Sequence, residues 1–521
     1  MSSRRWLLAV ASMSAALHLM GMARTPLPAQ DGLKFLRVAG QFQSQPWLDV
    51  VRASDQHPLY PALVALAEPA TAAVLGEGPD AWRVAAQFVS MLAAVGLLWP
   101  LHALTRGMFD DRTAGLAVFL YALLPFPAAI GHDTLSDGLA LGLTVAAMAL
   151  GEATLRTRSW RAALGCGAAA GLGFWARPEV ALVPPIVVIA GMFRRRPWRD
   201  ELAMFARLAA LSAVAMAFVG SYAAAKGQLS EKLSLRRSTS TGSETQALRR
   251  PPPLMPRGLD DPRFDFSPKE ESDAASYKDR PAEAAGQLGR EWAEGITYIL
   301  IPAVLLGLSR GWRRPGEAGG RLIVVFYAVA FAMIAIRHAS TLGYLSGRHA
   351  LTLIAAAVPW ASAGAWSWAE GLPGRRGLSV DRGRRLGFAA LAALLIAGVV
   401  VQAKAGHPSR WGHRAAGIWL AHQAAPGEAV LDTRGWASFV RGGPGYDYWH
   451  VRQALSDRNL RYIVVGSDEL KARSRRAATL RAMLAYAGKP VASFSGRRDG
   501  RGQGVEIYRF DPPASWEEIR P

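Results

Sequence analysis

The hydrophobic pattern of the chain predicts a membrane protein. Mostly uncharged stretches of roughly 16 to 24 residues recur between residues 6 and 401, and a helix needs about 20 such residues to cross the hydrocarbon of a bilayer. They predict about eleven spans, near residues 6–23, 82–105, 113–130, 136–155, 161–176, 178–193, 202–224, 294–309, 321–336, 349–368 and 386–402. The expected fold class is therefore mainly α, a polytopic transmembrane helix bundle.

A further apolar stretch, residues 60–75, is interrupted by Glu68 and Pro69. A charge and a proline disfavour a lipid-exposed span, so we predict a helix that lies on the outer membrane surface or dips into it. Counting it as a span would invert the orientation of every later segment. The first stretch follows Arg4 and Arg5, which also fits a cleaved signal peptide, but the many later spans favour a first membrane helix.

The pattern changes after residue 405. Strand-like runs occur at residues 429–431, 462–465, 491–494 and 505–510, with helical stretches near 412–424 and 472–487. This alternation predicts a small soluble α/β domain. We divide the chain into a transmembrane domain, residues 1–405, and a C-terminal domain, residues 406–521. In the first domain, residues 24–81 and 225–293 form outer loops, and the second loop, rich in Ser, Pro and charged residues, is expected to be partly disordered.

The distribution of basic residues predicts how the spans are oriented in the membrane. The formal net charge is +20. With the N-terminus inside, the inner segments hold 20 Arg and Lys residues, against 8 in the outer segments up to residue 83 and the short outer loops. Since short basic loops stay in the cytoplasm, we predict a multi-pass protein of the inner (cytoplasmic) membrane with a cytoplasmic N-terminus and an extracytoplasmic C-terminal domain. The basic clusters lie between spans, where anionic lipid is the nearer partner, so no nucleic-acid partner is expected. The single cysteine, Cys166, excludes an intramolecular disulfide.

Ionisable side chains gather in the predicted outer loops. The first loop carries Asp31, His57 and Tyr60, and Asp31 begins a short amphipathic run; a helix cap is the alternative role for this carboxylate. The next outer loop carries His132, Asp133 and Asp137. Because Asp137 falls inside an apolar run, where an ionised group is costly, it needs a partner or a function.

Two later outer segments add guanidinium groups. Arg177 and Glu179 lie between two apolar helices, where they pair with each other or serve a site. Tyr344, Arg348 and His349 precede a late span. Arginine suits a phosphate because it forms two parallel hydrogen bonds, although anchoring at the membrane interface is an equally plain role.

The sequence lacks the motifs of several common enzyme classes. The sequence has no Gly-rich nucleotide loop in a βαβ unit, no HExxH, no Cys-based metal spacing and no GxSxG. Acids, histidines and arginines at one membrane face instead indicate an enzyme whose activated substrate is dissolved in the lipid.

These residues resemble motifs of the C-type (GT-C) membrane glycosyltransferases, specifically the family 39-like group of protein mannosyltransferases and lipid A aminoarabinose transferases. The resemblance covers about 400 residues of the transmembrane part. It rests on Asp31 after the first span, the run His-Pro-Leu-Tyr-Pro at 57–61, the turn at 133–137, Ala-Arg-Pro-Glu at 176–179 and Gly-Arg-His at 347–349.

The resemblance implies transfer of a sugar from a polyprenyl-phosphate carrier to an acceptor protein, lipid or glycan outside the cytoplasm, with inversion at the anomeric carbon. It implies Asp31 as the general base, Asp133 or Asp137 as a ligand of acceptor, sugar or cation, and His57, Arg177 and Arg348 as phosphate ligands. Further substrate contacts would come from Tyr60, His132, Glu179, Tyr344 and His349. A divalent cation is the one cofactor considered, with Asp31 and Asp133 as candidate ligands.

Other functional classes fit parts of the same pattern. A transporter or flippase of lipid-linked saccharides also needs many spans and buried charges, but it predicts repeated halves with charges near the midplane. A lipid-linked glycan polymerase or ligase shares the donor and differs in the acceptor. A non-catalytic assembly or sensor protein predicts that Asp31 and Asp133 are dispensable.

Overall fold

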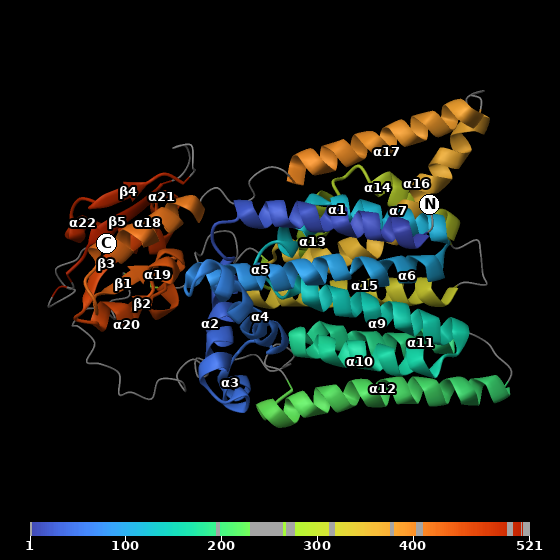
Figure 1. Cartoon of the computed structure of the whole chain (residues 1–521), viewed down its shortest axis with the longest axis horizontal. Coiled ribbons are helices and arrows are strands. Elements are labelled where there is room, and N and C mark those ends of the chain that lie inside the picture. The colour runs from blue at the N-terminus through green and yellow to red at the C-terminus, as the bar shows by residue number, and fades with distance from the viewer. Residues whose placement is uncertain are drawn as a thin grey trace.

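The computed structural model describes residues 3–193, 198–229, 264–266, 277–311, 318–375, 380–402, 410–496, 504–511 and 513. A bundle of long helices carries a small α/β unit at one end, and the N-terminus lies at the opposite end (Figure 1). The predicted fold class, a transmembrane helix bundle with a small C-terminal α/β domain, is confirmed.

Seven helices in the described part are long and apolar enough to cross a membrane. They are α1 (Ser3–Arg24), α5 and α6 (Pro79–Gly96 and Leu98–Met108) as one span, α9 (Asp137–Thr157), α12 (Trp198–Lys226), α15 (Ala318–Leu342), α16 (Leu351–Arg375) and α17 (Val380–Gln402). An eighth span is possible if α7 (Asp111–Leu123) and α8 (Pro125–Gly131), bent by 67°, count as one. Each lies on a predicted span.

Three other predicted spans fold as shorter helices. These are α10 (Trp160–Ala176), η1 with α11 (Pro178–Leu182 and Val183–Met192) and α14 (Ile301–Gly311). They pack within the bundle: α10 against α9 and α12, α11 against α15, and α14 against α16. We predicted that a span begins at residue 294, which is wrong: residue 294 belongs to α13 (Pro281–Gly295), which occupies the end of the expected outer loop, and α14 begins at Ile301. Thr297 and Tyr298, both with positive φ, separate it from α14. Residues 230–263 and 267–276 of that loop lie outside the described part.

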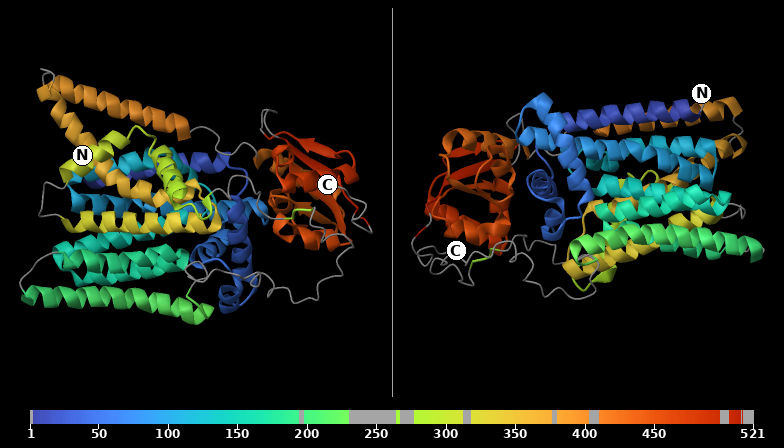
Figure 2. Two further views of the ribbon diagram at one scale, coloured as in Figure 1. Left: turned by 180° about the vertical axis from the view of Figure 1, so that it is seen from behind. Right: turned by 60° about the horizontal axis from the view of Figure 1, so that its bottom comes forward.

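Three helices of the first loop cover the end of the bundle nearest the α/β unit. They are α2 (Gln30–Ser44), α3 (Trp47–Ala53) and α4 (Leu59–Leu75). They lie across this end instead of running along the bundle, as two further views show (Figure 2). Phe35 of α2 and Tyr60 and Val64 of α4 pack with residues of α5. This arrangement agrees with the surface helix expected for residues 60–75.

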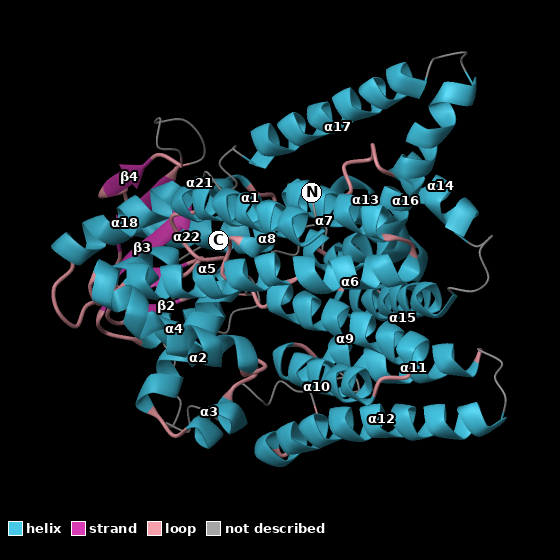
Figure 3. Cartoon of the chain, turned by 45° about the vertical axis from the view of Figure 1, so that its right-hand side comes forward, coloured by secondary structure: helices cyan, strands magenta, loops and turns pink. Residues whose placement is uncertain are grey.

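The C-terminal unit is a five-stranded sheet flanked by helices (Figure 3). Its strands are β1 (Ala429–Asp432), β2 (Gly445–Tyr446), β3 (Leu460–Gly466), β4 (Ala492–Phe494) and β5 (Val505–Arg509), in the order β2-β1-β3-β5-β4. β2, β1 and β3 are parallel, whereas β5 is antiparallel to β3 and β4. The helices are α18 (Arg410–Gln423), α19 (Trp436–Arg441), η6 (Tyr448–His450), α20 (Val451–Ser456), α21 (Ser467–Lys471) and α22 (Arg475–Ala487).

The four predicted strands all form, and the two-residue β2 is the one we did not predict, because its run is too short to show a period. Residues 264–266 of the second outer loop also join this unit: Phe264 and Phe266 pack in its core, and the Asp265 amide donates to Thr479 Oγ1 at 2.8 Å.

Glycines let α14 and α16 approach closely. A Cβ at Gly364 would overlap the carbonyl oxygen of Ala303, and one at Gly307 would overlap that of Trp360. Small residues at such crossings are typical of membrane helices. We expect Gly364→Val to separate the two helices and destabilise the protein by about 2 kcal/mol. Thermal unfolding in detergent would measure this effect. Gly286→Ala on α13, where the added methyl meets nothing within 4 Å, is the control, and equal melting temperatures for the two variants would contradict the packing.

Candidate functional site

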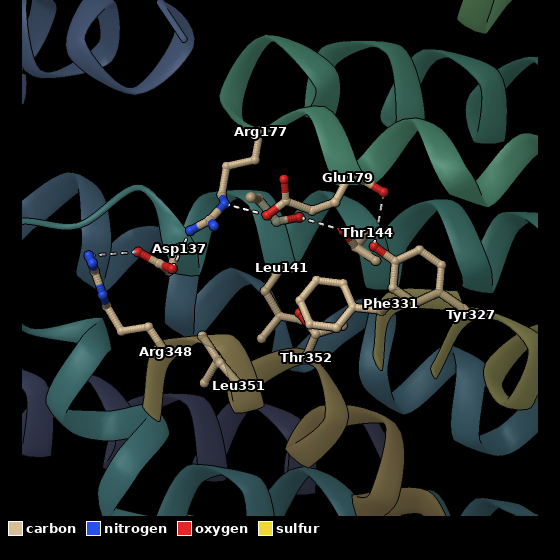
Figure 4. A pocket seen from close by; sticks show the side chains of 11 residues that line it. Asp137, Leu141, Thr144, Arg177, Glu179, Tyr327, Phe331, Arg348, Leu351 and Thr352 are labelled. Carbon is tan, nitrogen blue, oxygen red and sulfur yellow. Dashed lines mark hydrogen bonds and ion pairs between the residues drawn. The ribbon is translucent and has the colours of Figure 1, made fainter. Parts of the chain in front are cut away.

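A small cavity, open to solvent, lies at the end of the bundle that faces the C-terminal unit. Its charged wall consists of Asp137, Arg177, Glu179 and Arg348 (Figure 4). The remaining lining residues are Ala140, Leu141, Thr144, Tyr327, Phe331, Leu351 and Thr352. The cavity thus joins a charged head to a mostly apolar wall.

Local backbone signals place the charged residues there. Asp137 is the first residue of α9, where the helix dipole favours a negative charge. Pro178 disfavours helical geometry at the residue before it, so α10 ends at Ala176 and Arg177 is extended, with φ −157° and ψ 137°. The Arg177 side chain therefore reaches away from α10 toward the start of α9.

Arg177 is paired on two sides. Its Nη1 forms an ion pair with Asp137, and its Nε lies 2.5 Å from Oε1 of Glu179. Burial alone would lower the pKa of Arg177, but the carboxylates of Glu179 and Asp137 outweigh it and raise that pKa above its usual value. The guanidinium is therefore a permanent, fixed cation at the cavity wall.

Arg348 connects two unlike carboxylates. It lies in the turn η5 (Gly347–Ala350) before α16. Its Nη2 is 2.5 Å from Oδ2 of Asp31, and its Nη1 is 3.9 Å from Oδ2 of Asp137. The Asp31 side chain is 50% exposed, whereas that of Asp137 is only 6% exposed. Asp31 is therefore the more accessible of the two carboxylates, and Asp137 lies buried beside both guanidinium groups.

The apolar wall comes from residues we did not single out. Tyr327 and Phe331 lie one turn apart on α15, with their rings stacked at 6.2 Å, and the Tyr327 hydroxyl donates to the carbonyl of Glu179 at 3.2 Å. Both belong to an unbroken apolar run, where a wall residue looks like any other lipid-facing or core residue. The one available signal is the hydroxyl of Tyr327 inside a span.

Asp133 pairs with an arginine of the C-terminal unit and with backbone amides. Its Oδ2 is 2.8 Å from Arg410 Nη2 of α18, and its Oδ1 accepts from the Ala29 amide at 2.9 Å and the Thr134 amide at 2.8 Å. It is buried and surrounded by donors of the protein itself. This environment fits a structural carboxylate.

The two histidines predicted to contact substrate lie among other rings. His57 is buried and stacks on Tyr222 at 5.0 Å, with Phe174 edge-on at 5.6 Å. His132 lies 6.2 Å from the ring of His18 on α1. Neither lines the cavity.

Tyr344 and His349 border the site without lining it. Their rings are 6.3 Å apart, beside His338, and the Ser346 amide donates to His349 Nδ1 at 3.1 Å. In the described part of the chain, no group of three or more His, Cys, Asp and Glu side chains is arranged to hold a metal ion. Asp31 and Asp133, the candidate metal ligands, form ion pairs with different arginines, Arg348 and Arg410.

Tyr60, another predicted substrate contact, is fully buried. Its hydroxyl donates to the Ala86 carbonyl at 3.0 Å and lies 2.9 Å from Ser90 Oγ. We expect Tyr60→Phe to lower the free energy of unfolding by about 1 kcal/mol and to leave the activity within about twofold of the wild type. Thermal unfolding and activity measured on one preparation would check both effects. A large loss of activity without loss of stability would restore Tyr60 as a substrate ligand.

A family model matches part of this architecture. Residues 61–219 match the model described as dolichyl-phosphate-mannose-protein mannosyltransferase. The matched region includes Asp137, Arg177 and Glu179, and it excludes Asp31 and Arg348. No curated protein matches the chain.

Solved structures extend the likeness to the whole chain. The crystal structure of ArnT from Cupriavidus metallidurans bound to undecaprenyl phosphate has a TM-score of 0.58 at 11% identity, covering 99% of this chain and 99% of that one. The oligosaccharyltransferase AglB of Archaeoglobus fulgidus, in complex with an inhibitory peptide and a dolichol-phosphate, has a TM-score of 0.54 at 14% identity, covering 99% of this chain and 75% of that one. At such identities the likeness concerns the fold. Together with the sequence match over residues 61–219, this shared fold makes the chain similar to the C-type membrane glycosyltransferases.

Proposed function

We propose that this protein transfers a sugar from a polyprenyl-phosphate donor to an acceptor at the extracytoplasmic face of the inner membrane. The main support for this proposal is the cavity, in which two guanidinium groups, Arg177 and Arg348, lie next to an apolar wall. The half-exposed carboxylate of Asp31 lies at its mouth, paired with Arg348. An amphipathic ligand with an anionic head and a hydrocarbon tail matches both parts.

The donor phosphate binds between Arg177 and Arg348, which offer planar, permanently charged donors. Its first isoprene units lie along Leu141, Phe331 and Leu351 of the apolar wall. Negative charge grows on the phosphate as the glycosidic bond breaks. Fixed cations therefore stabilise the transition state more than they stabilise the ground state. Asp137 keeps the two cations from separating.

Asp31 acts as the general base. An acceptor hydroxyl oxygen attacks the anomeric carbon, the bond from this carbon to the phosphate oxygen breaks, its electron pair leaves with the polyprenyl phosphate, and the hydroxyl proton moves to Asp31. A single displacement inverts the anomeric centre. Asp31 also pairs with Arg348, but its side chain is 50% exposed, whereas those of Asp137 and Glu179 are 6% and 19% exposed, so Asp31 is the group best suited to take this proton.

The side of the membrane follows from charge. Asp31, Asp137, Arg177 and Arg348 meet at one end of the bundle, and the loops of the opposite end carry the larger share of short basic segments. From the positive-inside rule we infer that the site and the C-terminal domain lie outside the cytoplasm.

Purified protein in nanodiscs, given a panel of labelled polyprenyl-phosphate sugars with extracted protein, lipid and glycan acceptors, tests the proposal. We expect transfer from at least one polyprenyl-phosphate donor and none from the matching nucleotide sugars. Movement of labelled lipid across sealed vesicles without any transfer would instead favour a flippase and overturn the proposal.

A further inference from the structure

The short segment that joins α1 to α2 is held by the C-terminal unit. The carbonyl oxygens of residues 26, 27 and 28 accept hydrogen bonds from Arg414, Arg410 and Trp436 at 3.2, 2.9 and 2.9 Å. Residues 26 and 28 are prolines, which have no N–H and cannot continue a helix, so these carbonyls need donors from elsewhere. We call Arg410, Arg414 and Trp436 the clamp.

Arg410 holds the segment by two routes. Its Nη1 binds the Leu27 carbonyl directly, and its Nη2 lies 2.8 Å from Asp133, whose other oxygen accepts from the Ala29 amide. Ala29 is the residue immediately before α2, and Asp31 lies in the first turn of that helix. The contacts of Arg410 therefore end two residues from the proposed base.

The same face of the C-terminal unit continues along α2. The Lys34 ammonium lies 4.9 Å from the ring centre of Trp449, and Arg37 lies 3.8 Å from Asp447. A Cβ at Gly435 would come 3.2 Å from the Leu33 side chain. The first two turns of α2 thus rest on the domain as well as on the bundle.

We propose that Arg410, supported by Trp436 and Asp133, is a positioning residue for sugar transfer: it holds the start of α2 so that Asp31 faces Arg348 at the mouth of the cavity. The inference rests on the proposed function for what Asp31 does, but the geometry it predicts is measurable without activity. It also assigns Asp133 to positioning instead of to catalysis.

Attachment of the domain alone does not explain these contacts. Arg414 also forms two hydrogen bonds with Asp80 of α5, at 2.8 and 2.7 Å. That pair fastens the C-terminal unit to the bundle without involving residues 27–29. Variants that spare Arg414 and Asp80 therefore separate positioning from attachment.

Two variants loosen the clamp while keeping the domain attached. Trp436→Phe removes the N–H that binds the Pro28 carbonyl, together with part of the indole ring, and keeps an aromatic side chain. Arg410→Met with Asp133→Asn removes the pair together, because Arg410→Met alone would strand a buried carboxylate. Arg461→Met, a partly exposed arginine of β3, is the control.

The first experiment measures position. The native Cys166 is the one cysteine of the chain and is buried, so spin labels can be attached selectively at Gln45→Cys on the end of α2 and Thr341→Cys on α15, both exposed. We expect a narrow distance distribution in the wild type and in the control, and a broadened or shifted one in both clamp variants. An unchanged distribution in both variants would overturn the proposal.

The second experiment separates rate from donor binding. We expect kcat to fall about tenfold in Trp436→Phe and about 100-fold in the double variant, the order expected when a catalytic group moves by about 1 Å. The Kd for polyprenyl phosphate should stay within about twofold of the wild type. Parallel losses of rate and donor binding would mean that the clamp is merely structural. If the wild type transfers no sugar, the proposed function fails while the distance measurement still decides on the clamp.

Discussion

Asp31→Asn should lower sugar transfer by about 10²- to 10⁴-fold, the usual contribution of a general base. The amide keeps the size of the carboxylate but takes up no proton. The same change should not weaken donor binding: Arg348 loses its partner at 2.5 Å and becomes freer to meet a phosphate. Since a half-exposed ion pair contributes up to about 1 kcal/mol, affinity for polyprenyl phosphate should be unchanged or rise by up to about fivefold. Transfer rates with labelled donor and titrations with polyprenyl phosphate measure the two effects.

The combination is diagnostic because the two effects have opposite signs. Asp55→Asn, an exposed acid of the same loop, controls for the loss of a negative charge and should change neither quantity. Wild-type transfer in Asp31→Asn would remove Asp31 as the base. A marked loss of donor affinity would mean that Asp31 contacts the donor or a cation instead.

Arg177→Met should lower kcat by about 10²- to 10³-fold, as expected when a fixed group that stabilises developing negative charge is removed. It also leaves Asp137 and Glu179 without their shared cation, which destabilises a buried site by about 3–5 kcal/mol. Arg177→Lys keeps the charge but cannot meet both carboxylates with one planar group. We therefore expect Arg177→Lys to recover most of the stability and little of the rate.

Melting temperature and kcat measured side by side separate these effects. Arg158→Met is the matched control, since it removes an exposed ion pair with Asp200 at 2.9 Å outside the cavity. It should leave both quantities close to the wild type. Full activity in Arg177→Lys would show that a point charge is sufficient and that bidentate phosphate binding is not used.

The candidate site was only partly predictable, and the reason lies in where each group points. Asp133 and Asp137 are four positions apart, a spacing that would align them on one continuous helix. The turn between α8 and α9 breaks that continuity. Asp137 therefore faces Arg177, whereas Asp133 faces Arg410 of the C-terminal unit. The local sequence does not tell which of the two faces the cavity.

Long-range pairing was equally invisible. Asp31 and Arg348 are 317 positions apart, and the clamp connects α18 to a segment more than 380 positions earlier. A sequence pattern indicates that such residues lie at the same face of the membrane, but it does not indicate which of them form ion pairs or hydrogen bonds with one another.

The sequence by itself determined the membrane bundle, the α/β unit at the C-terminus and the gathering of ionisable groups at one end of the bundle. These follow from local free energies: an apolar run of about 20 residues favours hydrocarbon, and a proline disfavours helical geometry at the residue before it. The tertiary structure decided which of those groups share a cavity, which are buried under helices, and that a C-terminal domain holds the loop of Asp31. Those outcomes depend on packing between segments that are distant in the sequence. A small change in the direction in which a helix begins is enough to turn a side chain from one ion-pair partner to another.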